Sequence, residues 1–240
     1  MKLSVIIPVY NEEATINQLL DKVEMVSLPF VMGKQIEKEI VVVDDGSRDK
    51  SRELIEQRAK EKGNLIYFFH PKNLGKADAI KTGLAKSTGD ILLLQDADLE
   101  YDPADYPALL APILNGEAKV VFGSRFYHSK GHLASHKTIY WLHVIGNYFL
   151  TVITNVLYGA SLTDMETCYK VFTREALNKV LPLKAKRFDL EPELTSKFLK
   201  HGYKIKEVRI NYYSRDFKEG KKLTWRDGIK ALYYLIKERF

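Results

Sequence analysis

Short apolar runs alternate with helical patterns along the first half of the chain. The apolar runs cover residues 3–9, 39–43, 65–69, 90–94 and 119–123. Between them, apolar residues recur at helical spacing over residues 12–26, 50–62, 76–86 and 103–115. Runs this short, with little polar alternation, are typical of strands that are covered on both faces. The pattern therefore predicts an α/β fold in which helices cover both faces of a mostly parallel sheet.

Polar residues gather where these predicted strands end. They are Asn11 and Glu12 after the first strand, Asp44 and Asp45 after the second, and Asp96 and Asp98 after the fourth. In open parallel sheets, ligands bind at the carboxyl ends of the strands, so this edge is the expected site. No G-x-G-x-x-G motif follows the first strand, which argues against a nicotinamide-binding domain.

The second half of the chain has a long stretch, residues 138–163, without a formally charged residue. Its length raises the question of a membrane span. Polar residues nevertheless recur at helical spacing, opposite an apolar face. The polar set is His136, His143, Asn147, Thr151, Thr154 and Asn155, and the apolar set is Leu142, Ile145, Phe149, Val152, Ile153 and Val156. The pattern predicts an amphipathic helix near residues 137–160, lying in a membrane interface or capping the core of the domain.

The end of the chain is also predicted to be helical. Residues 225–240 place Leu232, Leu235 and Ile236 on one side and basic residues on others, which indicates a second amphipathic helix. A strand is expected just before it, over residues 204–210. At the other end, residues 1–10 have too short an apolar run for a signal peptide and are expected to form a buried strand.

Charge is divided unevenly between the two halves. Residues 1–120 hold 15 basic and 20 acidic residues, whereas residues 121–240 hold 22 basic and 11 acidic ones. An acidic half suggests a metal site, and a basic half suggests a surface for a pyrophosphate, an anionic membrane or a nucleic acid. A solvated, lysine-rich surface explains the same numbers equally well. The 240 residues suit one domain, and the single cysteine, Cys168, excludes an internal disulfide and is expected to be a small buried residue.

The segment Gln95–Glu100 carries the strongest local chemical signal. Asp96 and Asp98 stand at positions i and i+2 as the chain leaves a buried strand, so both carboxylates can reach one divalent ion. Hard oxygen ligands suit Mg²⁺ or Mn²⁺, which would neutralise the diphosphate of a departing nucleotide. A D-x-D pair alone is a weak signal. Its position after a strand of a βαβ series makes it much stronger.

Other strand ends offer further polar groups, each with an alternative role. Asp44 and Asp45 are candidates to accept hydrogen bonds from a base or ribose, or to cap the helix that begins near Asp49. Lys76 is placed to approach a phosphate or simply to start a helix. Arg125 ends the fifth strand, where a guanidinium can pair with phosphate.

Five segments, in this order and spacing, resemble the family 2 glycosyltransferases with the GT-A fold. They are PVYNEE, VVVDDGS, NLGKADAIKTGL, DADLE and GSRF. Each motif is modest alone, but five in register are specific, and the match covers essentially the whole chain. The branch that looks most similar is the polyprenyl-phosphate sugar synthases of the dolichyl-phosphate mannose and glucose type. Residues 163–170, residues 188–193, and Arg215 with residues 221–223 also point to this branch.

The resemblance implies an inverting, metal-dependent transfer of a hexose from a GDP-mannose- or UDP-glucose-type donor to polyprenyl phosphate. It places Mg²⁺ or Mn²⁺ at Asp96 and Asp98, with Glu100 as a further candidate ligand. The residues implied for the donor nucleotide are Pro8, Tyr10, Asn11, Glu12, Asp44, Asp45, Lys76 and Asp96. Arg125 and Arg215 would face the phosphates of donor or acceptor.

The resemblance also implies an arrangement at a membrane. Residues 1–125 would form the nucleotide-sugar-binding half of a single GT-A domain, and residues 126–240 the acceptor-binding half. The uncharged helix would lie in the interface, so the protein is expected at the inner, cytoplasmic face of the membrane as a peripheral protein. Its expected partners are the donor, a lipid acceptor, the anionic lipid surface and, as a further option, a separate membrane subunit.

The acceptor decides which other residues are catalytic. A polyprenyl phosphate is already an anionic nucleophile and needs no strong base, whereas a hydroxyl acceptor needs one within reach. The candidate bases are Asp164, Glu191 and Glu193, and their alternative roles are helix caps or an ion pair with Lys170 or Arg187.

Two other functions stay open at this point. One is a peripheral transferase with a hydroxyl acceptor in glycan, glycolipid or cell-wall polysaccharide synthesis. The other is a non-catalytic protein that binds nucleotides or nucleic acids. Carboxylates at the strand ends favour an enzyme, and the absence of any nucleic-acid motif predicts no nucleic-acid partner. His128, His132 and His136 have a spacing that could suggest zinc, but Ser129 and Gly131 between them favour a loop.

Overall fold

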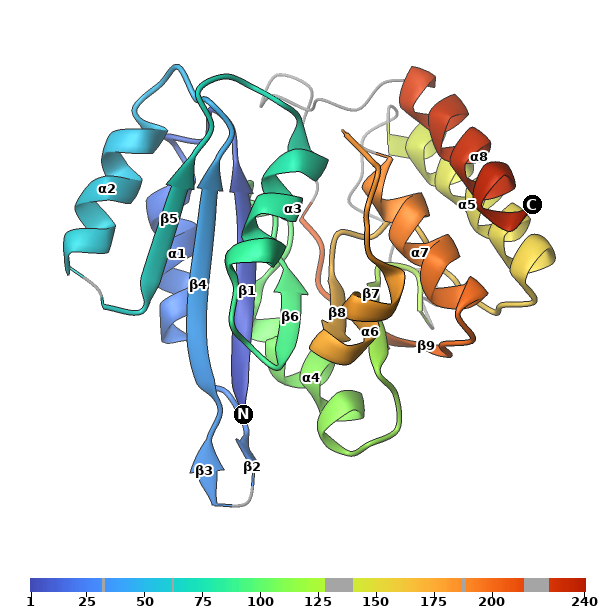
Figure 1. The fold of residues 1–240 in the computed structure, drawn as a ribbon, viewed down its shortest axis with the longest axis horizontal. Helices are drawn as coiled ribbons and strands as arrows, with labels where there is room; N and C mark the ends of the chain where they lie inside the picture. The colour runs from blue at the N-terminus through green and yellow to red at the C-terminus, as the bar shows by residue number, and fades with distance from the viewer. Residues whose placement is uncertain (32, 62, 128–139, 187–188, 214–224) are drawn as a thin grey trace.

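A computed structural model describes the chain from residue 1 to residue 240, except residues 32, 62, 128–139, 187–188 and 214–224 (Figure 1). Its central sheet has seven strands in the order β5-β4-β1-β6-β8-β7-β9. These strands are β1 (Lys2–Val9), β4 (Glu37–Asp44), β5 (Leu65–Phe69), β6 (Ile91–Leu94), β7 (Val120–Ser124), β8 (Lys170–Thr173) and β9 (Ile205–Arg209). A small hairpin, β2 (Phe30–Val31) with β3 (Lys34–Gln35), stands apart from the sheet.

The sheet is parallel apart from one strand. β8 runs antiparallel to both of its neighbours, β6 and β7, and every other pairing is parallel. The carboxyl ends of β1, β4, β6 and β7 therefore meet at one edge, as the sequence pattern predicts. β8 is not predicted by that pattern, because it is only four residues long and begins at the buried Lys170.

Helices cover both faces of the sheet. They are α1 (Ile16–Met25), α2 (Ser51–Glu61), α3 (Lys76–Lys86), α4 (Tyr106–Leu114) after the short 3₁₀ turn η1 (Pro103–Asp105), α5 (Tyr140–Tyr158), α6 (Arg174–Val180), α7 (Leu190–Lys200) and α8 (Trp225–Arg239). Figure 1 shows α3 in front of the sheet and α1 behind it. The helix predicted from residue 12 is wrong at its start: residues 12–15 form a turn, and α1 begins at Ile16. The other predicted elements of the first half agree with the structure within a few residues at their ends.

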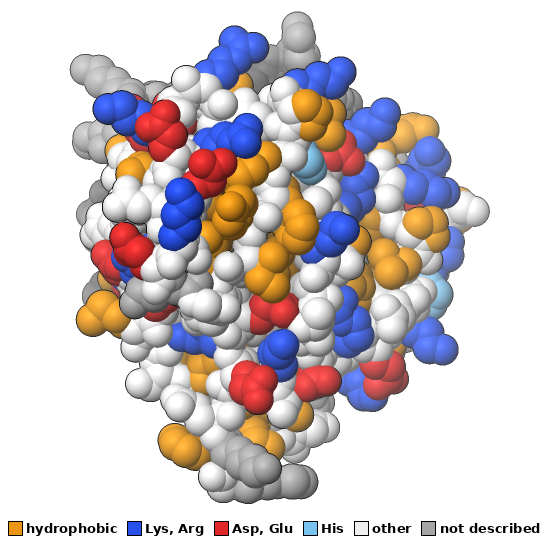
Figure 2. Space-filling model, turned by 60° about the vertical axis from the view of Figure 1, so that its left-hand side comes forward, with side chains coloured by type: hydrophobic (Ala, Val, Ile, Leu, Met, Phe, Trp, Pro, Cys, Tyr) orange, Lys and Arg blue, Asp and Glu red, His pale blue; other side chains and the backbone are white. Residues whose placement is uncertain are grey.

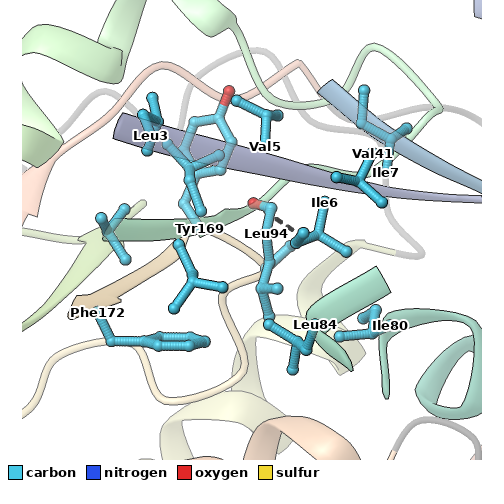
Figure 3. Close-up of a cluster of buried hydrophobic side chains, with 14 of the residues drawn as sticks. Leu3, Val5, Ile6, Ile7, Val41, Ile80, Leu84, Leu94, Tyr169 and Phe172 are labelled. Carbon is cyan, nitrogen blue, oxygen red and sulfur yellow. Dashed lines mark hydrogen bonds between the residues drawn. The ribbon is translucent and has the colours of Figure 1, made fainter. Parts of the chain in front are cut away.

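The main core lies between the sheet and these helices. Ile6 of β1 belongs to one buried cluster with Leu84 of α3, Leu94 of β6 and Phe172 of β8, and Leu3 lies on the other side of β1 (Figure 3). Gly83 lets α3 approach the sheet closely, since a Cβ atom there would collide with the side chain of Ile6. Continuous burial of β1, β4 and β6 explains why their sequences show almost no polar alternation.

A second, smaller core joins α5 and α8. It contains Leu150, Leu162, Met165, Ala231 and Leu235. This cluster holds α5 and α8 against the domain, beside α7, and the two helices lie next to each other at one end of the molecule (Figure 1). No helix in the described part of the chain is long and apolar enough to span a membrane.

The two faces of α5 have opposite surroundings. The polar residues Asn147, Thr151 and Thr154 are buried against the protein. Ile145, Phe149 and Val156, by contrast, are 61%, 56% and 78% exposed. The polar stripe therefore faces inward, and an apolar face is left on the outside.

The surface near the β5 edge of the sheet has a different character. Figure 2 shows basic and acidic side chains interspersed there, with apolar side chains between them. Such a mixture is typical of a solvated protein surface and differs from the continuous basic patch that nucleic-acid binding uses.

Candidate active site

Hydrogen bonds join the turn that follows β1 to the segment that follows β4. After β1, the backbone N–H groups of Asn11 and Glu12 donate to the hydroxyl groups of Ser47 (2.9 Å) and Ser51 (2.8 Å). The Asn11 side chain accepts a hydrogen bond from the N–H of Arg48 at 2.8 Å. The turn predicted from Pro8 to Glu12 thus lies beside the Asp44–Asp45 turn, and the contact of Pro8, Tyr10, Asn11 and Glu12 with a nucleotide stays a prediction.

Asp45 organises the loop that precedes α3. Its carboxylate accepts hydrogen bonds from the N–H groups of Leu74 (2.9 Å) and Gly75 (2.8 Å), and it contacts His70 Nδ1 at 2.7 Å. Gly46, with φ of 74°, allows this turn to touch the loop, because a Cβ atom there would lie 2.8 Å from the backbone nitrogen of Asn73. Asp45 therefore positions the segment that carries Lys76.

Asp44 has a different environment from its neighbour. It accepts from the N–H of Ser47 at 3.3 Å, and burial raises the pKa of Asp44 above its ordinary value. The alternative role for Asp44 and Asp45, capping the next helix, is wrong: Asp49 accepts from the N–H of Ser51 at the start of α2, at 3.0 Å. A role of Asp44 and Asp45 in binding the nucleoside stays a prediction.

Lys76 joins the D-x-D segment to α7. Its ammonium group lies 2.8 Å from Asp96 Oδ1 and 3.2 Å from Glu191 Oε1. Burial disfavours the charged form of Lys76, but Asp96 and Glu191 outweigh it and hold the pKa of Lys76 well above its ordinary value. The structure thus places a positively charged ammonium group between the carboxylates of Asp96 and Glu191.

The D-x-D turn itself has an unusual backbone. Leu99 has φ of 63°, and the N–H of Glu100 donates to Asp98 Oδ1 at 3.1 Å. Among the described residues, no group of three or more His, Cys, Asp or Glu side chains is arranged to hold a metal. Asp96 and Asp98 still fit Mg²⁺ or Mn²⁺, because such ions commonly use one or two carboxylates and complete their shell with water and substrate phosphates. Glu100 is the weaker candidate, since its carboxylate accepts from the Tyr212 hydroxyl at 2.8 Å.

Arg125 is engaged by Asp164 in a buried, bidentate ion pair. Nε and Nη2 of Arg125 lie 2.7 and 2.8 Å from the two oxygens of Asp164, whose side chain is fully buried. Asn147 of α5 donates to the same carboxylate at 2.9 Å. The ion-pair role considered for Asp164 is therefore correct in kind, but the described partner is Arg125 instead of Lys170. Arg187 itself lies outside the described residues.

Glu191 and Glu193, the two candidate carboxylates of α7, differ in whether their oxygen atoms already have hydrogen-bond partners. Glu193 is fully buried and accepts hydrogen bonds from the N–H groups of Lys184 (2.7 Å) and Ala185 (2.7 Å), and it pairs with Lys197 at 2.8 Å. Its oxygens are used within the fold. Glu191 contacts Lys76 through Oε1, whereas its buried Oε2 has no hydrogen-bond partner.

Sequence reasoning missed Glu166, which lies in the same region. Its Oε1 atom is buried and also has no hydrogen-bond partner. Burial, with the nearby charge of Glu191, raises the pKa of Glu166 to about 7. The available signal was an acidic residue in a segment whose other members, Met165, Thr167 and Cys168, are buried.

This raised pKa predicts that stability depends on pH through Glu166. Its pKa is about 7 in the fold against an ordinary value of 4.5, because burial and Glu191 oppose ionisation more than Lys170 and Arg125 favour it; Asp164 also opposes it. The stabilisation of the protonated form is complete below pH 4.5 and is lost as the pH rises through about 7. Glutamine does not ionise, so Glu166→Gln does not lose this stabilisation as the pH rises. Between pH 4.5 and 8, its free energy of unfolding should therefore rise relative to that of wild type by about 2–3 kcal/mol.

Urea unfolding of both proteins at intervals between pH 4.5 and 8 measures this difference. Titrating groups that do not interact with Glu166 are common to both proteins and cancel in the comparison. Parallel curves of stability against pH would show that Glu166 has an ordinary pKa.

Some predicted residues are not described by the structure. Arg215, like His128, His132 and His136, lies outside the described residues, so its phosphate contact stays a prediction. Cys168 is buried as expected and lies just before β8. Burial raises the pKa of the Cys168 thiol well above its ordinary value, which does not suit a nucleophile.

Comparison with known proteins agrees with this geometry. The model of the family described as "Glycosyl transferase family 2" matches residues 4–181. A dolichyl-phosphate beta-glucosyltransferase of Trichomonas vaginalis is 30% identical over 98% of this chain and 72% of its own length. An undecaprenyl-phosphate 4-deoxy-4-formamido-L-arabinose transferase of Proteus mirabilis is 26% identical over 98% of this chain and 67% of its own.

Solved structures show the same fold. The glucosyl-3-phosphoglycerate synthase of Mycobacterium tuberculosis, in complex with Mn²⁺, UDP and phosphoglyceric acid, has a TM-score of 0.71 at 23% sequence identity. The match covers 99% of this chain and 78% of that one. The architecture is therefore the GT-A fold that the motifs imply. From its family model and its relatives, the chain belongs to glycosyl transferase family 2 and is a glycosyltransferase.

Proposed function

We propose that the chain transfers a hexose from a nucleotide-sugar donor to polyprenyl phosphate, with inversion, at the cytoplasmic face of a membrane. Two relatives support the acceptor class, because their names specify dolichyl phosphate and undecaprenyl phosphate. The donor class is supported by a structure of the same fold that holds UDP and Mn²⁺. Residues 1–125 provide the donor half in this proposal, and residues 126–240 the acceptor half.

The observation that carries the membrane part is the orientation of α5. Phe149, Val152 and Val156 form an exposed apolar face, while Asn147 on the opposite face donates to Asp164 beside the candidate site. An apolar helix face on the surface of a folded domain suits the boundary between lipid headgroups and acyl chains. Inserting it there would bring the site close to a phosphate that a lipid chain anchors in the same membrane.

The residues at the strand ends have separate roles in the proposed reaction. Asp96 and Asp98 would hold Mg²⁺ or Mn²⁺, which supplies positive charge to the donor diphosphate as it leaves. Lys76 holds Asp96 in place and adds a second positive charge on the same side. The acceptor phosphate oxygen attacks the anomeric carbon opposite the leaving diphosphate, so the configuration inverts and no strong base is needed.

A hydroxyl acceptor is the second candidate. It is favoured by one observation: the buried Oε2 of Glu191, in the same site as Lys76, has no hydrogen-bond partner and is available to accept a proton. A product assay with matched phosphate and hydroxyl acceptors decides between the two candidates.

Membrane binding is expected to depend on the outer face of α5. The protein should float with vesicles that contain anionic lipid, weakly at high salt, and alkaline carbonate should release it. Phe149→Glu should lower the partition coefficient by about tenfold or more, because burying a phenylalanine side chain contributes roughly 1.5–3 kcal/mol. Met25→Glu is the matched control, since Met25 is an exposed apolar residue of α1.

Vesicle flotation at several salt concentrations measures this. Equal loss in Phe149→Glu and Met25→Glu would show that α5 is not the docking face. Absence of binding by the wild-type protein at every salt concentration would count against the membrane proposal as a whole, and resistance to carbonate would indicate deeper insertion than the proposal allows.

A further inference from the structure

Three buried side-chain oxygens in the described part of the chain have no hydrogen-bond partner: Glu166 Oε1, Thr167 Oγ1 and Glu191 Oε2. They come from only two segments, the loop before β8 and the first turn of α7. Buried polar atoms in folded proteins are almost always bonded, so unbonded ones need an explanation. Other buried carboxylates nearby, such as Asp164 and Glu193, do have partners.

The loop that carries Glu166 is held firmly through its backbone. Glu207 accepts from the N–H groups of Thr163 and Asp164 at 2.8–3.0 Å. Two polar side chains of α5 accept from the N–H groups of the next two residues. Thr151 Oγ1 accepts from the N–H of Met165 at 3.2 Å, and Asn147 Oδ1 accepts from the N–H of Glu166 at 3.3 Å.

A side chain continues this support. Lys170 donates to the carbonyl oxygen of Met165 at 3.0 Å. The backbone around Glu166 is thus fixed by three elements, yet Oε1 of its side chain has no hydrogen-bond partner. A rigid backbone with an unused polar group is the arrangement expected of a preorganised binding residue.

The two carboxylates lie beside the expected position of the donor. Lys76 contacts both Asp96 (2.8 Å) and Glu191 (3.2 Å), so one ammonium group separates Glu191 from the D-x-D segment. Glu166 interacts electrostatically with Glu191 and with Arg125. The hexose of a nucleotide-sugar is bonded directly to the diphosphate, so a diphosphate held at Asp96 brings the hexose to this region.

The chemistry of the pair selects what can bind there. Both carboxyl groups offer an oxygen without a hydrogen-bond partner, and the negative charge of the Glu191 carboxylate disfavours a phosphate close to it. They accept hydrogen bonds well, and hydroxyl groups are uncharged donors. A hexose presents several hydroxyl groups, so it satisfies these oxygens where an acceptor phosphate does not.

We propose that Glu166 and Glu191 form the subsite for the donor's hexose, in which Glu166 Oε1 and Glu191 Oε2 accept hydrogen bonds from hydroxyl groups of the sugar. This inference rests on the nucleotide-sugar donor of the proposed function. Glu166 is then a residue that distinguishes one sugar from another, since it favours a hydroxyl group at the position that it contacts.

The test compares binding of a nucleotide with and without its sugar. Wild type, Glu166→Gln and Glu166→Ala are titrated by calorimetry with UDP, UDP-glucose, GDP and GDP-mannose in the presence of Mn²⁺. Both variants should keep the wild-type affinity for the nucleoside diphosphate that the protein binds. The affinity for the matching nucleotide-sugar should fall by about tenfold or more in Glu166→Ala and by less in Glu166→Gln, whose amide oxygen is a weaker acceptor.

Glu39→Gln is the matched control for a buried carboxyl group. Glu39 accepts from Thr88 at the opposite end of the sheet, and its replacement should leave the ratio of the two affinities unchanged. An unchanged ratio in Glu166→Ala, or an equal loss of diphosphate and nucleotide-sugar binding, would overturn the hexose subsite. A wild-type protein that binds none of the four ligands would instead refute the donor class, and with it both proposals.

Discussion

Replacing Asp98 by asparagine is expected to lower the rate of sugar transfer by about a hundredfold or more. The asparagine side chain keeps the size of aspartate but loses the negative charge that attracts a divalent ion. The metal supplies several kcal/mol of charge stabilisation to the departing diphosphate, and each 1.4 kcal/mol corresponds to about tenfold in rate. Removing Mg²⁺ or Mn²⁺ with EDTA should have the same effect on the wild-type enzyme and should be reversed by adding the metal back.

Asp102→Asn is the control for this prediction. Asp102 lies in the same acidic segment, but it caps the η1 turn by accepting from the N–H of Ala104 at 3.2 Å. Because asparagine caps a helical turn about as well as aspartate, this replacement should leave both the stability and the transfer rate nearly unchanged. Initial rates with each variant, measured over a range of Mn²⁺ concentrations, provide the comparison. Full activity of Asp98→Asn in the presence of EDTA would remove the metal from the mechanism.

Arg125→Met is expected to destabilise the protein by about 3–5 kcal/mol. It removes one partner of a buried ion pair and leaves the fully buried carboxylate of Asp164 without its counter-charge. A chain of this length should then lose roughly 10 °C in melting temperature. Adding Asp164→Leu to Arg125→Met should restore part of this loss, because it removes the uncompensated charge.

A surface ion pair provides the contrast. Lys206 lies 3.4 Å from Glu117, and both side chains are about half exposed. Lys206→Met should change the free energy of unfolding by less than about 1 kcal/mol. Urea unfolding of the three variants at one pH gives the values. A cost for Arg125→Met no greater than that for Lys206→Met would show that the Arg125–Asp164 pair does not stabilise the fold.

The parallel part of the fold could be predicted from the sequence because each strand is a short apolar run at regular spacing. β1, β4 and β6 are buried on both faces, and burial on both faces leaves little room for polar residues. β8 gave no such signal, since its first residue, Lys170, is charged. That lysine is accommodated by backbone carbonyl oxygens of the preceding loop, a contact that only the folded chain reveals.

The orientation of α5 shows a different limit. Its residue pattern predicts two unlike faces but does not say which one points inward. Asn147 and Thr151 point inward because the loop before β8 offers them backbone N–H groups and the Asp164 carboxylate. Those partners are many residues away from α5 along the sequence, so the local residue pattern does not reveal them.

Candidate site residues that directly follow the end of a strand could be predicted from the sequence. Those whose role depends on contacts with other elements of the fold could not. Asp96 and Lys76 could be placed from the pattern of strands and turns, and the structure brings them into contact. The engagement of Arg125 by Asp164, and the unpaired oxygen of Glu166, depend on residues from separate elements. Sequence alone therefore indicated the proposed metal and diphosphate region better than the proposed sugar subsite.

The acceptor is the central claim and has a direct test. The enzyme is incubated with Mn²⁺, UDP-glucose or GDP-mannose, and either a polyprenyl phosphate or the polyprenol of the same chain length, and the lipids are analysed by mass spectrometry. The proposed function predicts that one hexose is added to the polyprenyl phosphate with at least one donor, and that none is added to the polyprenol. Glycosylation of the polyprenol, or no glycosylated lipid with either donor, would contradict it.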